Sequence, residues 1–182
     1  MKETEYRDCK VAIKGVVPLL HHKFIASTER VGRQIYEPKE EAKKGLYLNK
    51  EGVPIQPAVH IEGAIIKAAR DFKMKGRKTY SDFCKASLII LEREIPFDND
   101  QADKWVIDEQ PVVINRARVL CWRPRWDEWS FHFTIRNLQP SMLDDVTLRQ
   151  ILEKAGNFIG VGDFRPKFGR FEVVEFEPIS KA

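Results

Sequence analysis

Residues 146–177, VTLRQILEKAGNFIGVGDFRPKFGRFEVVEFE, contain the pattern that decides the fold. In the first part, apolar residues recur at helical spacing, which predicts an amphipathic helix over residues 146–158. A glycine-rich stretch follows at residues 160–170. Aromatic or aliphatic residues then alternate with acids, which predicts a final strand over residues 171–177. The apolar stripe of the predicted helix consists of Leu148, Ile151, Leu152, Ala155 and Phe158.

The start of the chain predicts a first strand and a long connection. Apolar and charged residues alternate over residues 6–17, and this predicted strand ends where Pro18 follows. The stretch at residues 19–50 is charged and lacks a sustained period, except for a short helix predicted at residues 40–46. This part of the chain therefore predicts a strand followed by an extended insertion.

The middle of the chain predicts a helix, a buried strand and a hairpin. Residues 60–72 carry a continuous apolar face, which predicts an amphipathic helix. A short helical turn at residues 82–85 and a buried strand at residues 87–91 follow. Further strands are predicted at residues 112–114, 118–122 and 129–136, the last two as hairpin arms around a turn at 123–128.

These elements give the order strand, helix, strand, strand pair, helix, strand. That order predicts an α+β fold, a single ferredoxin-like or RRM-like β-α-β-β-α-β domain over residues 1–182 with an inserted β-hairpin and long loops. We expect the insertions at about residues 18–56 and 97–128, and no linker separates two cores.

The composition excludes several protein classes. The 182 residues are 43% hydrophobic and 32% charged, which excludes disorder and collagen-like repeats. Three cysteines, Cys9, Cys84 and Cys121, lie far apart and form no zinc or disulfide pattern. With neither a membrane-spanning stretch nor a signal peptide in the sequence, we expect a cytoplasmic protein with no membrane partner.

The net charge of +4 hides separate blocks of charge. Residues 64–80 contain six cations and one acid, and residues 110–126 contain four arginines and no acid. Residues 92–109 between them contain seven acids and two cations. The basic blocks suit a polyanion held through its phosphates, although solvated charged faces would give the same pattern.

Two stretches combine cations with features typical of nucleic-acid contacts. Near the predicted hairpin turn, Arg123 and Arg125 alternate with tryptophans such as Trp126, and indole rings can stack on unpaired bases or pack within a sheet. The glycine-rich stretch lets the backbone approach a ligand, or simply makes turns. The candidate nucleic-acid-binding residues are Lys14, Lys67, Arg70, Lys73, Lys75, Arg77, Lys78, Arg116, Arg118, Arg123, Arg125, Trp126, Arg165, Lys167 and Arg170.

The histidines are the only candidates for catalysis. His21 and His22 follow the first predicted strand, where either of them could act as a general base on a 2′-hydroxyl. The sequence contains no H-x-x-x-H motif and no nucleotide-binding glycine motif, so we expect neither a metal nor a cofactor.

Three stretches resemble the RAMP superfamily, the RRM-like RNA-binding proteins of CRISPR effector complexes, and most closely its compact backbone subunits, which line the guide RNA. Residues 11–19, VAIKGVVPL, are similar to the first strand of that family and its exit. Residues 55–70, IQPAVHIEGAIIKAAR, resemble the entry into its first helix. Residues 160–173 resemble its glycine-rich loop and last strand.

The resemblance implies a non-catalytic subunit that assembles head-to-tail along single-stranded guide RNA, with target nucleic acid and other effector subunits as further partners. Relatives that cut target RNA share an aspartate after the first strand, and residues 18–59 contain none. Relatives that process guide RNA often use a histidine there, so a metal-independent endoribonuclease using His21 or His22 is one alternative. A phage single-stranded nucleic-acid-binding or protein-assembly module is another.

Overall fold

The computed structural model describes residues 6–24, 37–74, 76, 78–114 and 116–179. Within them, an antiparallel sheet of four strands has the order β4-β8-β1-β9. Its strands are β4 (Leu88–Ile90), β8 (Ser130–Asn137), β1 (Arg7–Gly15) and β9 (Phe171–Ile179).

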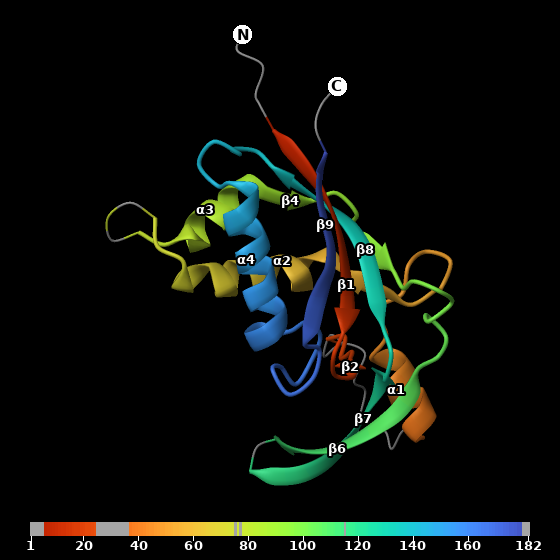
Figure 1. Cartoon of the computed structure of the whole chain (residues 1–182). Coiled ribbons are helices and arrows are strands. Elements are labelled where there is room, and N and C mark those ends of the chain that lie inside the picture. The colour runs from red at the N-terminus through yellow and green to blue at the C-terminus, as the bar shows by residue number, and fades with distance from the viewer. Residues whose placement is uncertain (1–5, 25–36, 75, 77, 115, 180–182) are drawn as a thin grey trace.

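Two helices cover one face of this sheet (Figure 1). Helix α2 (Ala58–Ala68) connects β1 to β4, and helix α4 (Asp145–Lys154) connects β8 to β9. Helix α4 begins after Asp144, whose Oδ1 accepts a hydrogen bond of 2.8 Å from the Thr147 amide. The chain order β1, α2, β4, β8, α4, β9 with this strand order is the ferredoxin-like arrangement, which confirms the predicted α+β fold.

Alternation along β1 explains how the sheet meets the helices. Cys9, Val11 and Ile13 are buried against α2 and α4, whereas Lys10 and Lys14 are exposed on the opposite face. The open face therefore carries charges. In register, Lys14 lies opposite Glu172, and Asp8 near the start of β1 lies opposite Ile179 at the end of β9.

Several helices differ in extent from the sequence prediction. Helix α2 begins directly after Pro57 and ends in a 3₁₀ turn, and helix α4 passes into a π-helical turn, η3 (Ala155–Ile159). The turn predicted at residues 82–85 is part of a full helix. The remaining helical segments are α1 (Pro38–Lys44), η2 (Ala69–Asp71) and α3 (Tyr80–Ser87).

The predicted hairpin arms were wrong. Strand β6 (Val106–Ile114) pairs with β7 (Ala117–Trp126), so residues 123–126 belong to a strand and not to a turn. Residues 129–136 instead fall almost entirely within β8 of the four-stranded sheet. The β6–β7 hairpin projects beyond that sheet as a curved arm (Figure 1).

Short strands attach the hairpin arm and the start of helix α2 to the rest of the fold. Strand β2 (Leu19–Leu20) pairs with the end of β7, and β3 (Ile55–Pro57) pairs with β5 (Glu94–Pro96). Within the described ranges, the helices are too short or too polar to cross a membrane.

Candidate nucleic-acid interface

The glycine-rich loop, residues 160–170, is fastened to strand β2 through its backbone. The Asp163 amide donates to the Leu20 carbonyl at 2.9 Å, and the Gly169 amide donates to the Pro18 carbonyl at 2.8 Å. Gly169 has a φ of 73°, and a Cβ atom there would overlap the Val161 carbonyl oxygen. The loop thus has a fixed path that leaves three predicted cations exposed: Arg165, Lys167 and Arg170.

An ion pair joins this loop to the base of the hairpin arm. The Asp163 Oδ2 atom lies 3.0 Å from Arg123 Nε and 3.4 Å from His22 Nδ1. Arg123 is only 4% exposed, and its guanidinium carbon lies 4.7 Å from the centre of the Phe164 ring. Burial acts to raise the pKa of Asp163, but His22 and Arg123 outweigh it and hold that pKa below its ordinary value.

Arg123 is therefore a structural residue in this conformation. Its Nη1 atom is buried and makes no hydrogen bond to any described residue, so the Asp163 carboxylate supplies its counter-charge. A phosphate cannot reach a guanidinium that is covered in this way. Sequence reasoning assigned Arg123 to nucleic acid because it did not anticipate that the loop folds over it.

A chain of polar contacts joins His21, Gln56 and His60. His21 Nε2 donates to the side-chain oxygen of Gln56 at 3.0 Å, and the Gln56 amide donates to His60 Nδ1 at 3.0 Å. His21 is fully buried, and burial lowers its pKa to about 3. Burial and the nearby Arg165 also lower the pKa of His60.

The burial of His21 corrects the expectation that it could act as a general base on RNA. Its ring is enclosed by Tyr47, Phe97 and Trp126, at centroid separations of 5.3, 6.0 and 4.6 Å. A general base must come within hydrogen-bond reach of the proton that it removes. His22 is the more accessible of the two, with its side chain 45% exposed beside Asp163.

A second cationic surface surrounds the C-terminal end of α2. We call the exposed side chains of Lys67, Arg70, Lys73 and Lys78 the α2 basic surface. The acid in this stretch, Asp71, lies 2.6 Å from the ammonium of Lys154, a residue of α4 that the sequence prediction missed. The predicted residues Lys75 and Arg77 lie outside the described residues.

In the part of the hairpin arm that the structure describes, the exposed cations lie near its turn. Arg116 and Arg118 are exposed there, whereas Arg125 near the base pairs with Asp108 at 2.8 Å and with Asp127 at 2.9 Å. Trp126 is fully buried and stacks on Phe97, with ring centroids 4.7 Å apart. This burial corrects the expectation that Trp126 stacks on a base, because neither face of its indole is open to solvent.

Among the described residues, the predicted cations lie in separate groups and do not form one patch. The glycine-rich loop lies near His60 at the N-terminal end of α2, and the α2 basic surface lies at the other end. An α-helix of this length spans about 16 Å. Lys14 is exposed on the open face of the sheet, and the hairpin arm projects beyond the sheet (Figure 1).

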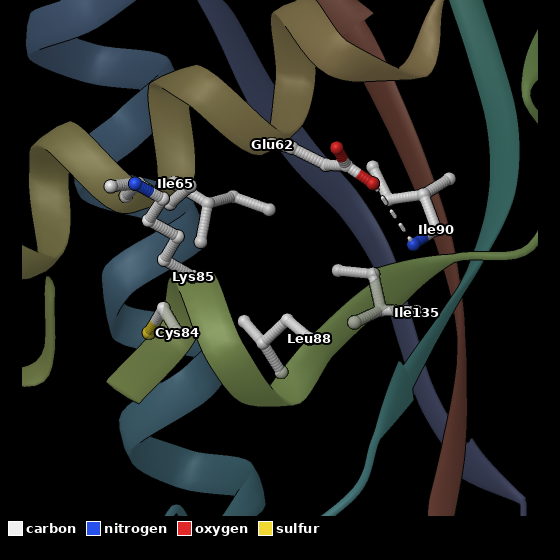
Figure 2. Close-up of a pocket in the computed structure, with 8 residues that line it drawn as sticks. Glu62, Ile65, Cys84, Lys85, Leu88, Ile90 and Ile135 are labelled. Carbon is white, nitrogen blue, oxygen red and sulfur yellow. Dashed lines mark hydrogen bonds between the residues drawn. The ribbon is translucent and has the colours of Figure 1, made fainter. Parts of the chain in front are cut away.

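A small pocket between α2, α3 and β4 is lined by aliphatic side chains together with Glu62, Cys84 and Lys85 (Figure 2). Its lining is mostly aliphatic, and Glu62 accepts a hydrogen bond of 3.4 Å from the Ile90 amide. Burial raises the pKa of Cys84 to about 11, which keeps this thiol protonated at neutral pH. In the part of the chain that the structure describes, His, Cys, Asp and Glu side chains form no metal-binding group.

Comparisons with known proteins give matches in structure but not in sequence. No family model matches the sequence, and no curated protein matches it. A chain in the cryo-EM structure of the type III-B Cmr-beta bound to cognate target RNA matches with a TM-score of 0.61 and 14% identity. That match covers 98% of the present chain and 62% of the Cmr-beta chain.

A second solved structure also matches the present chain in fold, and the match covers its whole length. Cmr6 from Pyrococcus furiosus matches with a TM-score of 0.51 and 9% identity, over 96% of the present chain and 100% of Cmr6. The chain has the fold of these Cmr proteins. This is the fold that the resemblance to the RAMP superfamily predicted, and it is shared despite the low identity.

Proposed function

We propose that this chain is a non-catalytic RNA-binding backbone subunit of a CRISPR-type ribonucleoprotein that assembles along guide RNA. The observation that carries the proposal is a set of exposed cations on a Cmr-type fold. Among the residues that the structure describes, these side chains form no ion pair: Lys67, Arg70, Lys73, Lys78, Arg116, Arg118, Arg165, Lys167 and Arg170.

Unpaired cations of this kind favour contacts to a phosphate backbone. Cations that are already paired with carboxylates must lose those partners before they bind a phosphate, as Arg125 would. Within the described residues, the cations at the two ends of α2 form no such ion pair, and each phosphate that they neutralise would release condensed counterions. Contacts of this type give affinity with little sequence preference, which suits a subunit that repeats along one RNA.

The hairpin arm would contact either the RNA or a neighbouring copy. Arg116 and Arg118 provide positive charge near its turn, and Val113 and Leu120 are exposed apolar side chains beside them. In the register of the hairpin, Val113 lies opposite Arg118. An arm with adjacent apolar and cationic groups suits a wedge between bases or a grip on the next subunit.

Head-to-tail assembly would use the acidic stretch at residues 92–109. Two of its acids are occupied internally, since Asp98 pairs with His132 and Asp108 pairs with Arg125. Three others, Glu94, Asp100 and Asp103, are exposed. These acids complement the basic surfaces of another copy, and such an unlike pair of surfaces gives an open chain of subunits.

The test is RNA binding by the full chain at several salt concentrations. A fluorescent single-stranded RNA reports the dissociation constant of the wild type and of a variant in which glutamine replaces Arg70, Lys73 and Lys78. Each lost phosphate contact reduces the slope of log K against log salt by about 0.7 for a single strand, so the variant should lose about 2 units of slope. A matched control variant carries glutamine at three exposed lysines elsewhere: Lys39, Lys43 and Lys50.

The outcomes separate the parts of the proposal. Weak binding with a reduced slope in the first variant, and not in the control, supports phosphate contacts at the α2 basic surface. Equal slopes in the wild type and both variants would remove that surface from the binding site. Failure of the wild type to bind single-stranded RNA at low salt would overturn the proposed function itself.

A further inference from the structure

The C-terminal end of helix α4 departs from the α-helical path. The Gly160 amide donates to the Ala155 carbonyl at 2.8 Å, which closes a π-helical turn over residues 155–159. Gly156 occupies the buried side of this turn, where a Cβ atom would overlap the carbonyl oxygen of Phe171. A single π turn inserts one extra residue into the helix, and such turns occur frequently at functional sites.

Phe158, within this π turn, lies on the surface and not in the core. The apolar stripe of α4 runs through Leu148, Ile151 and Leu152, and helical spacing would continue it to Phe158. Phe158 is instead 66% exposed, whereas Ala155 and Gly156 are buried. The fold therefore presents a large aromatic ring to solvent at a place where the sequence pattern predicts burial.

A lysine lies close to this exposed ring. The Lys154 ammonium lies 5.7 Å from the centre of the Phe158 ring and 6.0 Å from that of Phe72. Lys154 also pairs with Asp71 at 2.6 Å, which neutralises the acid in this part of the surface. Phe72 directly follows the 3₁₀ turn that contains Arg70. Because Lys154 lies near both Phe72 and Phe158, the Phe158 ring lies beside the α2 basic surface.

We propose that Phe158 is a stacking platform for an unpaired base of the RNA whose phosphates contact the α2 basic surface. This inference rests on the proposed function and names the chemistry of one of its contacts. Aromatic rings in single-strand binding sites stack on bases of any sequence, and cations beside them hold the backbone. A lysine against one face of the ring and a base against the other would form a cation–π arrangement.

The charge of the surroundings favours a nucleic acid over an apolar protein segment. Because Asp71 is paired with Lys154, the α2 basic surface keeps an excess of positive charge from Lys67, Arg70 and Lys73. A protein partner with an apolar contact would need several acids to match these cations, whereas a single strand supplies a flat base and phosphates together.

The experiment uses the full chain and a single-stranded RNA that carries 2-aminopurine, whose fluorescence falls when the base stacks. Phe158→Ala should reduce RNA affinity by about tenfold and abolish the quenching, because one stacking contact is lost. It should leave the slope of log K against log salt unchanged, since stacking neutralises no phosphate. Phe158→Trp should restore both affinity and quenching.

Two controls make the result specific. Phe24→Ala removes another exposed phenylalanine, 84% exposed and located after β2, and should leave RNA affinity unchanged. Thermal unfolding of Phe158→Ala should match that of the wild type, because the removed ring is mostly exposed.

The results distinguish this inference from the function on which it rests. If the wild type binds RNA and Phe158→Ala binds equally well, the platform is wrong and the proposed function stands. If the wild type does not bind RNA, the proposed function fails. If Phe158→Ala changes self-association without RNA and leaves RNA affinity intact, Phe158 belongs to a protein contact and the inference is overturned.

Discussion

The Asp163 carboxylate lies 3.0 Å from the Nε atom of Arg123 and so joins the glycine-rich loop to the base of the hairpin arm. The two residues are 40 positions apart in sequence: Arg123 belongs to the inserted hairpin arm, and Asp163 belongs to the glycine-rich loop between η3 and β9. One ion pair therefore joins the glycine-rich loop to the hairpin arm, and each of these two elements carries exposed cations.

Asp163→Ala should lower the free energy of unfolding by about 2 kcal/mol, because it leaves the buried Arg123 guanidinium without a counter-charge. Urea denaturation followed by tryptophan fluorescence measures the change. Combining it with Arg123→Met should cost less than the sum of the two single variants. Strict additivity would show that the two side chains do not interact.

The buried His21 predicts a dependence of stability on pH. Its folded-state pKa is about 3, whereas the unfolded value is about 6.5. Between these values the unfolded chain binds a proton that the folded chain does not, so the free energy of unfolding should fall by about 1.4 kcal/mol per pH unit below pH 6.5.

The contribution of His21 is measured by difference. Urea denaturation at pH 7.5, 6.0 and 5.0 should show a shallower fall for His21→Phe than for the wild type. Equal slopes for His21→Phe and the wild type would contradict the buried, neutral state of His21.

Two glycines with similar backbone angles should differ strongly in their tolerance of a side chain. Gly169 has a φ of 73° with the Val161 carbonyl against it, whereas Gly52 has a φ of 80° with no atom within 4 Å. Gly52→Ala should cost about 1 kcal/mol for the left-handed backbone alone. Gly169→Ala should cost clearly more and lower RNA affinity, since it displaces the loop that carries Arg165 and Lys167.

The arm should show a separation between stability and binding. Trp126→Ala should lower the free energy of unfolding by about 3 to 5 kcal/mol, because it empties a fully buried site. Arg118→Gln should leave the melting temperature unchanged and weaken RNA binding, since this side chain is exposed. The structural role of Trp126 would be contradicted by a loss of RNA binding without a loss of stability in Trp126→Ala. The binding role of Arg118 would be contradicted by a loss of stability in Arg118→Gln.

The α+β fold was predictable because its core strands and helices carry clear apolar periods. Cys9, Val11 and Ile13 alternate along β1, and the stripe of α4 follows helical spacing as far as Ala155. Local patterns of this kind are visible in the sequence because each element buries one face against the same core.

The hairpin was misplaced because its strands do not follow an apolar pattern. Strand β6 contains Asp108, a 5% exposed acid that a sequence pattern assigns to solvent, and its burial depends on Arg125 of β7. The residues of the candidate interface were misjudged for a similar reason. Arg123 and Trp126 are covered by the loop and by Phe97, and contacts between distant segments leave no local signal.

The position of the two described ends limits how copies of the chain can be fused. Asp8 and Ile179 are register partners in neighbouring strands, and Figure 1 shows both ends at the pole of the sheet opposite the hairpin arm. A fluorophore attached at Ile179 would therefore lie far from the arm. Tandem copies arranged head-to-tail would need a linker as long as one subunit, whereas a circular permutant could join these ends with a few residues.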